Sequence, residues 1–315
     1  MSRRIAVALG ACLAALVVGR LAGPARYEID GLSMAPGLMP GDVVVSDAFP
    51  VADWLRQPRR FERWVVDSPD GIAIKRLVGL PGETVSIGGG DLSINGTRCL
   101  KGPRLVAETA VEVPQSAGPE HRRHVRFDGC EVLDDADFAT EVNRPLLPVR
   151  DVGIAMIVRA PTTSTRIHIG IDASQVTWEL AAHHRACFVA GRLDGHLVAT
   201  GWTIPDARAP GEGGCLPTPA PDTWSHVIPL PEGDAATTDA PAITLDVDDD
   251  TAVVEQLTLW RDVLYRPGAD GREEWRLKPD EFFMLGDFLT ASRDSRRWGP
   301  LPREALRHRV LRAEP

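Results

Sequence analysis

Between Arg104 and Leu259, short strand-like segments recur about every ten residues and are separated by loops rich in proline and glycine. The whole chain contains 29 glycines and 26 prolines, a combination that favours turns and interrupts helices. Regular short strands at this spacing are typical of sandwich-type β units. The sequence therefore predicts a mainly β protein with a β-sandwich-like unit in this central region.

The regions on either side of this unit share a different pattern, in which short apolar runs are broken by turn residues. The strands expected in the first of them are Val43–Val45, Trp64–Val66, Ile72–Val78 and Thr84–Ile87, with a hairpin over residues 88–96. The central strands are expected at residues 154–159, 166–171, 176–180, 197–204, 242–247 and 253–259. We expect one domain, formed by residues 24–103 and 260–315, interrupted by an inserted β-rich domain, residues 104–259.

The composition excludes several classes of protein. With 43% hydrophobic and 25% charged residues, the chain of 315 residues is globular and long enough for two domains. Its mean hydropathy of -0.11 excludes a membrane protein with many spans. The net charge of -9, without a long basic run before the C-terminal tail, argues against a nucleic-acid partner.

The N-terminus contains an apolar segment. Residues 5–19 carry no charge and follow Arg3 and Arg4, and an extension to Gly23 approaches the ~20 residues that span a bilayer. We expect a membrane anchor at residues 5–23, with residues 1–4 in the cytoplasm and the remainder exported. A cleaved signal peptide is the main alternative, although its best cleavage site, Gly23-Pro24-Ala25, contains an unfavourable proline. A helix buried in the protein core is the third interpretation of this segment.

The five cysteines do not indicate a metal site. Cys12 lies in the apolar segment, and the other four, Cys99, Cys130, Cys187 and Cys215, permit three pairings. One or two disulfides and free buried thiols both remain open. No cofactor or metal is expected.

Lysine is rare in this chain. Of 35 basic residues only Lys75, Lys101 and Lys278 are lysines. Arginine keeps its proton in proteins, whereas a desolvated lysine can lose it and act as a base. Lys75 has apolar neighbours on both sides, so in a strand its amine would project from an apolar surface. Lys101 and Lys278 are expected to be ordinary surface charges.

Ser33 lies in a Gly/Pro-rich turn, where a serine can be held exposed for nucleophilic attack. A serine hydroxyl needs a base, and no histidine lies in the segments around Ser33, Lys75 or Ser292. Lys75 can serve if burial lowers its pKa towards neutrality. The residues alone also permit a plain turn serine and a lysine that reaches to solvent.

Three segments resemble the signature motifs of type I signal peptidases, which are membrane-bound Ser–Lys proteases. They are SM-x-P-x-L-x-x-GD at residues 33–42, KR-x-x-G-x-PGE at 75–83, and GD followed by S-x-DSR-x-WG at 286–299. The resemblance covers about 130 residues in the order of the family. It implies a signal-peptidase-like β protease core after one N-terminal transmembrane helix.

The resemblance also implies roles for individual residues. Ser33 would be the nucleophile and Lys75 the general base, while Ser292 would hydrogen-bond the lysine amine and orient it. Asp294 and Arg296 would form a structural ion pair, and Gly286 and Asp287 belong to the third motif. Some members carry a serine two residues before the nucleophile as an oxyanion donor, where this chain has Gly31.

Substrate and location follow from the same resemblance. The partners would be exported preproteins and membrane lipid, with cleavage after small residues at the end of the signal peptide. The protein would cross the bacterial cytoplasmic membrane once, with its N-terminus inside and its catalytic domain on the extracytoplasmic side. The oligomeric state and the function of the inserted domain stay open.

Two rival readings are weighed against this one. One is another Ser–Lys protease of the same fold, such as a self-cleaving repressor or a mobilisation-system maturation protease. The repressor would need a DNA-binding N-terminal domain, where this chain has an apolar segment. A membrane-anchored binding protein with a vestigial protease core would not need Ser33, Lys75 and Ser292 together.

Overall fold

The computed structural model describes residues 24–47, 57–114, 123–127, 132–134, 146–205, 220–230 and 241–314. It is mainly β, as the sequence predicts. Within these ranges no helix has the length and apolar character needed to cross a bilayer. The predicted anchor, residues 5–23, lies outside the described residues, as do Cys12, Cys130 and Cys215.

The chain separates into two compact units. Unit 1 contains the chain up to Ser86, Ile94–Gly96 and Pro267–Pro315, and unit 2 contains Ile87–Ser93 and Thr97–Arg266. Unit 2 therefore extends beyond residues 104–259 at both ends.

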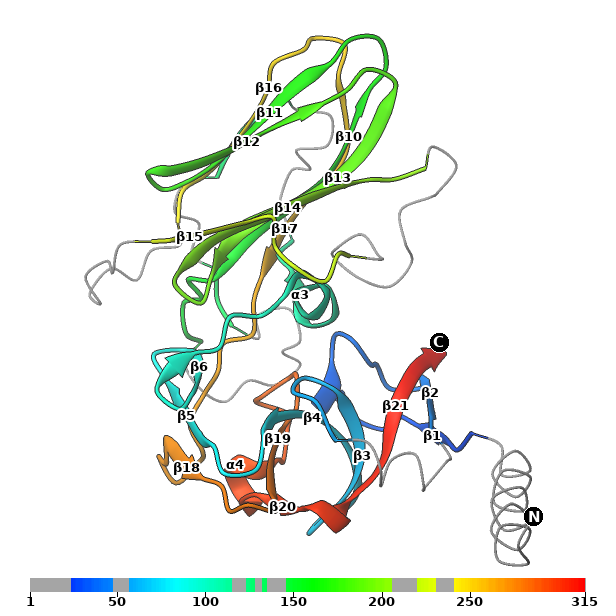
Figure 1. The fold of residues 1–315 in the computed structure, drawn as a ribbon, viewed down its shortest axis with the longest axis vertical. Coiled ribbons are helices and arrows are strands. Elements are labelled where there is room, and N and C mark those ends of the chain that lie inside the picture. The colour runs from blue at the N-terminus through cyan, green and yellow to red at the C-terminus, as the bar shows by residue number, and fades with distance from the viewer. Residues whose placement is uncertain are drawn as a thin grey trace, which may run out of the picture. The chain divides into compact units, whose positions relative to one another are not determined.

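Unit 1 contains a seven-stranded sheet in which segments from both ends of the chain lie side by side (Figure 1). Its pairs are antiparallel. In spatial order its strands are β1 (Arg26–Glu28), β2 (Val43–Ser46), β21 (Leu306–Glu314), β3 (Arg63–Ser68), β4 (Gly71–Gly79), β19 (Glu281–Leu285) and β20 (Leu301–Pro302). The C-terminal strand β21 thus pairs with both β2 and β3.

This sheet is buried on both faces, as β3 illustrates. Trp64 and Val66 pack in one apolar cluster with Leu77 of β4. Val65, between them in sequence, packs in another cluster with Ile74 of β4. Successive side chains of a strand point to opposite faces, so the short apolar run at residues 64–66 supplies both.

Among its described residues, unit 1 also contains three short helices. They are the 3-10 helices η1 (Leu32–Met34) and η2 (Arg303–Ala305), and the helix α4 (Ser295–Trp298). A four-stranded sheet has the order β18 (Glu274–Arg276), β5 (Thr84–Gly88), β6 (Asp91–Ile94) and β7 (Thr97–Arg98). Strands β5 and β6 correspond to the hairpin expected over residues 88–96.

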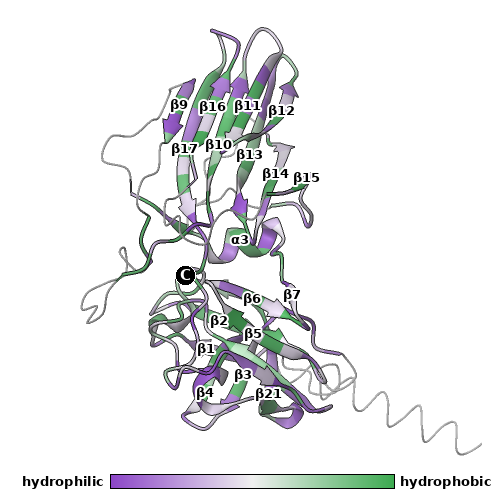
Figure 2. Cartoon of the chain, turned by 90° about the vertical axis from the view of Figure 1, so that its left-hand side faces the viewer, coloured by the Kyte–Doolittle hydropathy of each residue, from purple (hydrophilic) through white to green (hydrophobic). Residues whose placement is uncertain are grey.

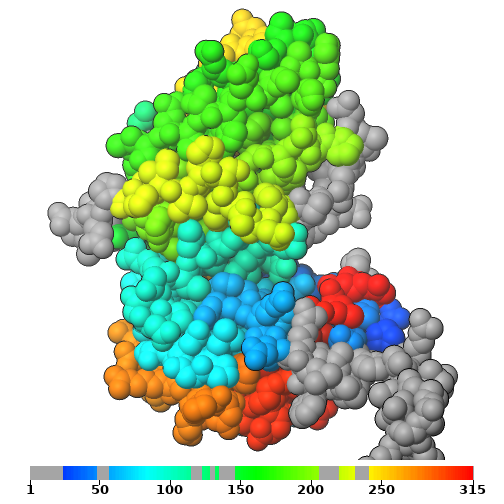
Figure 3. All heavy atoms as spheres, in the orientation of Figure 1, coloured from blue at the N-terminus to red at the C-terminus, as the bar shows by residue number. Residues whose placement is uncertain are grey.

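Unit 2 contains two further sheets. The six-stranded sheet has the order β15 (His226–Pro229), β14 (His196–Thr203), β13 (His184–Leu193), β10 (Val152–Ala160), β17 (Val253–Arg261) and β8 (Val111–Glu112). The four-stranded sheet has the order β12 (Ser174–Leu180), β11 (Thr165–Ile171), β16 (Ile243–Val247) and β9 (His124–Phe127). The segment that carries the edge strand β15 lies at the surface, as the yellow band in Figure 3.

The two sheets of unit 2 share one apolar core. Ile154 and Met156 of the larger sheet belong to the same buried cluster as Ile167 and Ile169 of the smaller one. Figure 2 shows hydrophobic and hydrophilic residues alternating along β11 and β16 of the smaller sheet, as expected where one face of a strand is solvated. Unit 2 is therefore a two-layer β structure.

Several elements of unit 2 were not expected from the sequence, among them the short strands β8, β9 and β15, the long strand β13 and the helix α3 (Pro103–Thr109). Strand β13 is buried on both faces, with Phe188 in the core between the sheets and Val189 in a second cluster, so it lacks a polar face. The helix α3 begins after Gly102 with a proline in its first turn, a position that tolerates proline because no N–H partner is needed there.

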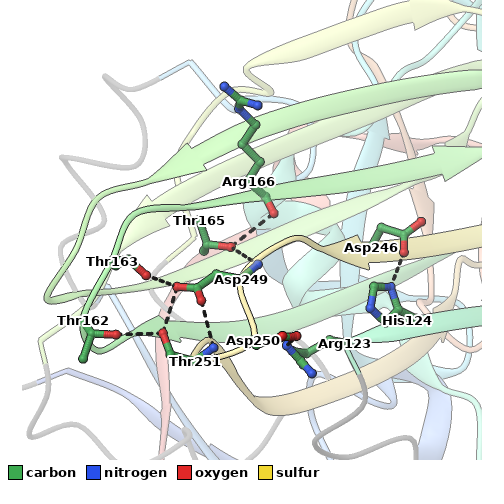
Figure 4. A network of polar contacts seen from close by, with 10 residues as sticks. All are labelled: Arg123, His124, Thr162, Thr163, Thr165, Arg166, Asp246, Asp249, Asp250 and Thr251. Atoms are coloured by element: carbon green, nitrogen blue, oxygen red, sulfur yellow. Dashed lines mark hydrogen bonds and ion pairs between the residues drawn. The ribbon is translucent and has the colours of Figure 1, made fainter.

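A polar network ties two turns of unit 2 together (Figure 4). The Asp249 carboxylate, in the turn before β17, accepts hydrogen bonds from the Thr163 hydroxyl and from the N–H and hydroxyl of Thr251, the latter two at 2.9 and 2.8 Å. The Asp249 N–H donates to the Thr165 hydroxyl at 3.2 Å. These bonds to the carboxylate, led by that from Thr163, lower the pKa of Asp249. The acidic run at residues 248–250 therefore has a structural role in closing this end of the unit.

Candidate active site

Ser33 lies in η1, in a segment fixed by its buried neighbours. Met34 and Leu38 are 2% and 0% exposed and pack in the core under the sheet. The segment turns back at Gly41, which has a φ of 95°, and the Asp42 carboxylate accepts the N–H of Met39 at 2.7 Å. The apolar and Gly-Asp positions of the first motif therefore hold the backbone around Ser33 in place.

Lys75 lies on β4, and its side chain reaches Ser33. The Nζ donates to Ser33 Oγ at 2.8 Å and to the Ile74 carbonyl at 3.1 Å. The lysine is only 4% exposed, although Ile72 on the same strand is 56% exposed. The two residues, 42 positions apart in sequence, form a hydrogen-bonded pair of a hydroxyl and a buried amine.

Burial lowers the pKa of Lys75 from 10.5 to about 8. Desolvation is the largest cause, because a charged amine loses its water shell in the core. The carboxylates of Asp294 and Asp287 oppose this effect, and the guanidinium of Arg296 adds to it. A substantial fraction of the amine is therefore neutral near pH 8 and able to accept a proton.

Gly286 allows three segments to meet beside this pair. A Cβ added at this glycine would lie 2.3 Å from Ser292 Oγ and 2.4 Å from the Ser33 carbonyl oxygen. The next turn is also joined to Ser33, whose carbonyl accepts the N–H of Phe288 at 3.2 Å. A glycine is required here because any side chain would separate the third motif from the nucleophile segment.

Ser292 lies next to this contact but does not hydrogen-bond Lys75. Its Oγ is buried and has no hydrogen-bond partner among the described residues. The orientation of Lys75 expected from Ser292 is therefore not formed in this structure. The two hydrogen bonds of the amine go instead to Ser33 and to the carbonyl of Ile74.

Asp294 and Arg296 form a buried bidentate ion pair. The Arg296 Nε and Nη2 donate to the two carboxylate oxygens at 2.8 Å each. The Asp294 carboxylate also accepts the N–H of Gly286 at 3.2 Å, and Arg296 donates to the Leu289 carbonyl at 2.6 Å. The pair thus fixes the turn that carries Gly286 and Ser292.

A second buried ion pair was not assigned from the sequence. Arg76 donates through Nε and Nη2 to the two oxygens of Asp287 at 2.7 Å each, and both side chains are 4% exposed. Arg76 also donates to the Phe61 carbonyl at 2.8 Å. The sequence offered one indication of this pair: Arg76 follows Lys75 in the second motif, and Asp287 is the aspartate of the Gly-Asp motif. The pair joins β4 to the turn after β19.

A pocket of about 210 Å³ opens beside Ser33 and Lys75. It is lined by Tyr27, Glu28, Ile29, Asp30, Gly31, Ser33, Met34, Ile72, Ala73, Ile74 and Lys75. Among the described strands, β4 pairs with β19 only from Arg76 onwards, so its stretch at residues 72–75 has β3 as its one neighbour. Strand β1 is likewise at the edge of the sheet. Two strand segments with open edges therefore border the pocket.

A serine hydroxyl bonded to a desolvated amine beside a pocket is an arrangement suited to acyl transfer. The sequence profile described as signal peptidase, peptidase S26, matches residues 2–145 and 247–312. The chain belongs to this family. It is accordingly a serine peptidase of the signal peptidase type. No curated protein matches the chain. The internal stretch between the two matched segments, residues 146–246, belongs to unit 2.

The other two lysines differ from each other. Lys278 is exposed and pairs with Glu281 at 2.8 Å, as expected for a surface charge. The expectation for Lys101 was wrong, because it is 1% exposed and its ammonium is paired with Asp262. Sequence alone did not reveal this, since the neighbours of Lys101 along the chain include Gly102 and Pro103 and form no apolar run.

One group of carboxylates in the described part of the chain has the spacing of a metal site. Oxygens of Asp91, Asp151 and Asp194 lie within 4.8 Å of one another in unit 2. Arg98 pairs with Asp91 at 2.8 Å, and the N–H of Asp194 donates to Asp151 at 2.8 Å. Burial, the largest cause, raises the pKa of Asp151 to about 8, so protonation also reduces the charge of the group.

Proposed function

We propose that this protein removes N-terminal signal peptides from exported preproteins by a Ser33–Lys75 mechanism. The observation that carries the proposal is the 2.8 Å contact between Lys75 Nζ and Ser33 Oγ, with the amine buried and its pKa lowered to about 8. Membership of the signal peptidase family supports the reaction class.

In the first step, neutral Lys75 takes the Ser33 proton while Oγ attacks the scissile carbonyl carbon. The tetrahedral oxyanion collapses to an acyl-enzyme as Lys75 returns the proton to the leaving amine. Lys75 then activates a water molecule, which releases the second product and restores Ser33. Asp294–Arg296 and Arg76–Asp287 act as positioning pairs near the amine.

Stabilisation of the oxyanion is assigned to the Ser33 N–H. Such a backbone donor contributes about 3–4 kcal/mol to the transition state in serine proteases. Gly31 offers no hydroxyl at the position where some relatives have a serine. Ser292 remains the candidate for orienting Lys75, because its buried hydroxyl lacks a partner.

The substrate is proposed to bind as an extended strand between the open edges at residues 27–31 and 72–75. Main-chain hydrogen bonds to such edges hold a peptide in register with little dependence on its sequence. Small residues before the cleaved bond would fit a pocket of about 210 Å³ lined by Met34 and Ala73.

We also propose that the protein acts at the bacterial cytoplasmic membrane. Residues 5–23 would anchor it with residues 1–4 in the cytoplasm and the catalytic unit on the extracytoplasmic side. The proposed partners are preproteins and membrane lipid, and no nucleic acid is involved.

The test is to incubate the detergent-solubilised protein with a preprotein in wild-type, Ser33→Ala and Lys75→Arg forms. We expect cleavage by the wild type alone, because arginine retains the charge but cannot accept the serine proton. Circular dichroism would verify that both variants are folded. Full activity of Lys75→Arg would exclude the lysine mechanism, and an inactive wild type would exclude the proposed substrate class.

A further inference from the structure

Lys101 in unit 2 is held in place by its backbone as well as by its side chain. Its N–H donates to Asp194 Oδ2 at 3.2 Å, and its carbonyl accepts the indole N–H of Trp224 at 2.7 Å. Its ammonium donates to Asp262 Oδ2 and lies 4.7 Å from the centre of the Tyr265 ring. The amine is therefore directed at one carboxyl group.

Both members of the pair are removed from solvent. The side chains of Lys101 and Asp262 are 2% and 1% exposed. Two opposite charges in such a site lose their hydration, and an ion pair balances that loss only when its remaining hydrogen-bonding groups also find partners.

Those remaining groups are not satisfied here. Within the described residues, Asp262 Oδ2 is the one hydrogen-bond acceptor for the three donors of the ammonium, and Asp262 Oδ1 is buried without a partner. An amide formed between the same two side chains has one N–H and one carbonyl oxygen to satisfy. The surroundings of the pair fit the amide better than the two separate ions.

The presence of lysine rather than arginine at position 101 also favours an amide over an ion pair. Arginine is the better residue for a buried ion pair, because it binds both carboxylate oxygens. Unit 1 follows this rule in Arg76–Asp287 and Arg296–Asp294. Lys101 departs from it in a chain with 32 arginines and three lysines. A lysine amine can become a nucleophile, which a guanidinium cannot.

We propose that Lys101 and Asp262 are joined by an intramolecular amide bond between Nζ and Cγ. This cross-link is a modification of unit 2 and does not depend on the proposed peptidase mechanism.

The reaction needs no other reagent. A proton moves from the ammonium to the Asp262 carboxylate, the neutral amine attacks Cγ, and the C–O bond to the departing oxygen breaks. The ammonium and the carboxylate together become one amide and one molecule of water, without oxidation or reduction. Each molecule reacts once, so a neutral pair that is rarely populated is sufficient.

The surroundings assist this condensation. Asp194 accepts the Lys101 N–H at 3.2 Å and so helps to hold the backbone that carries the amine. The Tyr265 ring and the closed site keep water away from the pair, which favours condensation over hydrolysis.

The bond would have a clear topological effect. Lys101 precedes α3, and Asp262 directly follows β17, so the two residues lie near the start and the end of unit 2. The link spans 161 positions and would close almost the whole unit into a covalent loop. A cross-link over a long loop restricts the unfolded chain and thereby stabilises the folded state.

Intact-mass spectrometry of the purified full-length chain tests the proposal. We expect the wild type to be lighter than its sequence by the mass of one water molecule, and Lys101→Arg to have the full sequence mass. Asp262→Asn is a sharper variant, because condensation of an amide side chain releases ammonia and gives the same final product mass as the wild type.

Peptide mapping of the wild type covers the case in which the variants fail to fold. Trypsin does not cleave after an acylated lysine, so we expect a branched peptide that joins Cys99–Arg104 to Asp262–Arg272. A water loss that maps to another residue would overturn the proposal. A wild type of full mass, with complete cleavage after Lys101, would also overturn it.

Discussion

Unit 1 and unit 2 each bury one lysine, and the two amines have opposite acid–base properties. Lys75 contacts the neutral hydroxyl of Ser33. The two nearby carboxylates, Asp294 and Asp287, are each paired with an arginine. Desolvation therefore dominates and lowers the pKa of Lys75 to about 8. In the unlinked pair Lys101 is also desolvated, but Asp262, Tyr265 and Asp194 together outweigh this effect and raise its pKa. Burial alone therefore does not make a lysine a base. The combined charges of the neighbouring groups decide whether its pKa falls or rises.

The largest expected effect is a difference in cleavage activity between variants of Lys75 and Lys101. Lys75→Met should lower kcat/KM for preprotein cleavage by about 10²–10⁴-fold, the range attributed to a general base. Lys101→Met should cleave at nearly the wild-type rate below its own unfolding temperature, since it is outside the site. The measurement is initial rate against substrate concentration. Equal losses in both variants would show that the two lysines do not have separate functions.

The second prediction compares the stability of variants at the buried Lys101 and at the exposed Lys278. Lys101→Met leaves Asp262 buried without its partner and also removes the proposed cross-link, so it should lower the free energy of unfolding by at least about 3–5 kcal/mol. Lys278→Met, which removes an exposed pair, should change it by no more than about 1 kcal/mol. Chemical denaturation monitored by tryptophan fluorescence gives both values. A Lys101→Met variant as stable as Lys278→Met would contradict the importance of the buried pair.

The third prediction concerns the packing around Lys75. Gly286→Ala places a methyl group against Ser292 and the Ser33 carbonyl, and should destabilise unit 1 by about 1–3 kcal/mol while reducing kcat. Gly31→Ala is the matched control, because a Cβ there meets nothing within 4 Å. Thermal unfolding and cleavage assays compare them. If the two variants behave alike, close packing at Gly286 is unimportant for the site.

The fourth prediction is the pH dependence that follows from Lys75. Because its pKa in the folded protein is about 8, the neutral base is lost as the pH falls through that value. Below pH 8, kcat/KM should fall about tenfold per pH unit, since the protonated amine cannot accept the serine proton. A profile that stays flat from pH 8 down to pH 6 would be inconsistent with Lys75 as the base.

The smallest expected effect is an increase in kcat. Gly31→Ser adds a hydroxyl two residues before the nucleophile, in open space and with an ordinary φ of -132°. If it reaches the oxyanion, kcat should rise by about 3–10-fold, less than the full value of a preorganised donor. The Gly31→Ala variant controls for the change of backbone. No difference between them would show that the hydroxyl does not contact the oxyanion.

Several strands were predictable because their apolar runs end at turn residues. β2, β3, β4 and β11 fall where the sequence indicates them. Strand β13 was missed because both of its faces are buried, which removes the alternation that identifies a half-exposed strand. The short helix α3 was missed because its seven residues give little periodic signal.

The candidate site, like the strands, was predictable only in part. The motifs singled out Ser33 and Lys75, but the partner of Asp287 was not assigned, and the Ser292 hydroxyl does not bond Lys75. Side-chain partners across the sheet depend on strand register and rotamers, which local sequence does not specify.

The sequence by itself determined that the chain is mainly β, that its motifs are those of a signal peptidase, and that three positions keep lysine among many arginines. Only the tertiary structure decided which of these lysines are buried, and beside which group. Lys75 had apolar neighbours along the chain, but Lys101 did not, and its burial comes from residues far away in sequence, such as Asp262 and Tyr265. The charge state of an amine is set by what surrounds it in space, and distant segments supply those surroundings.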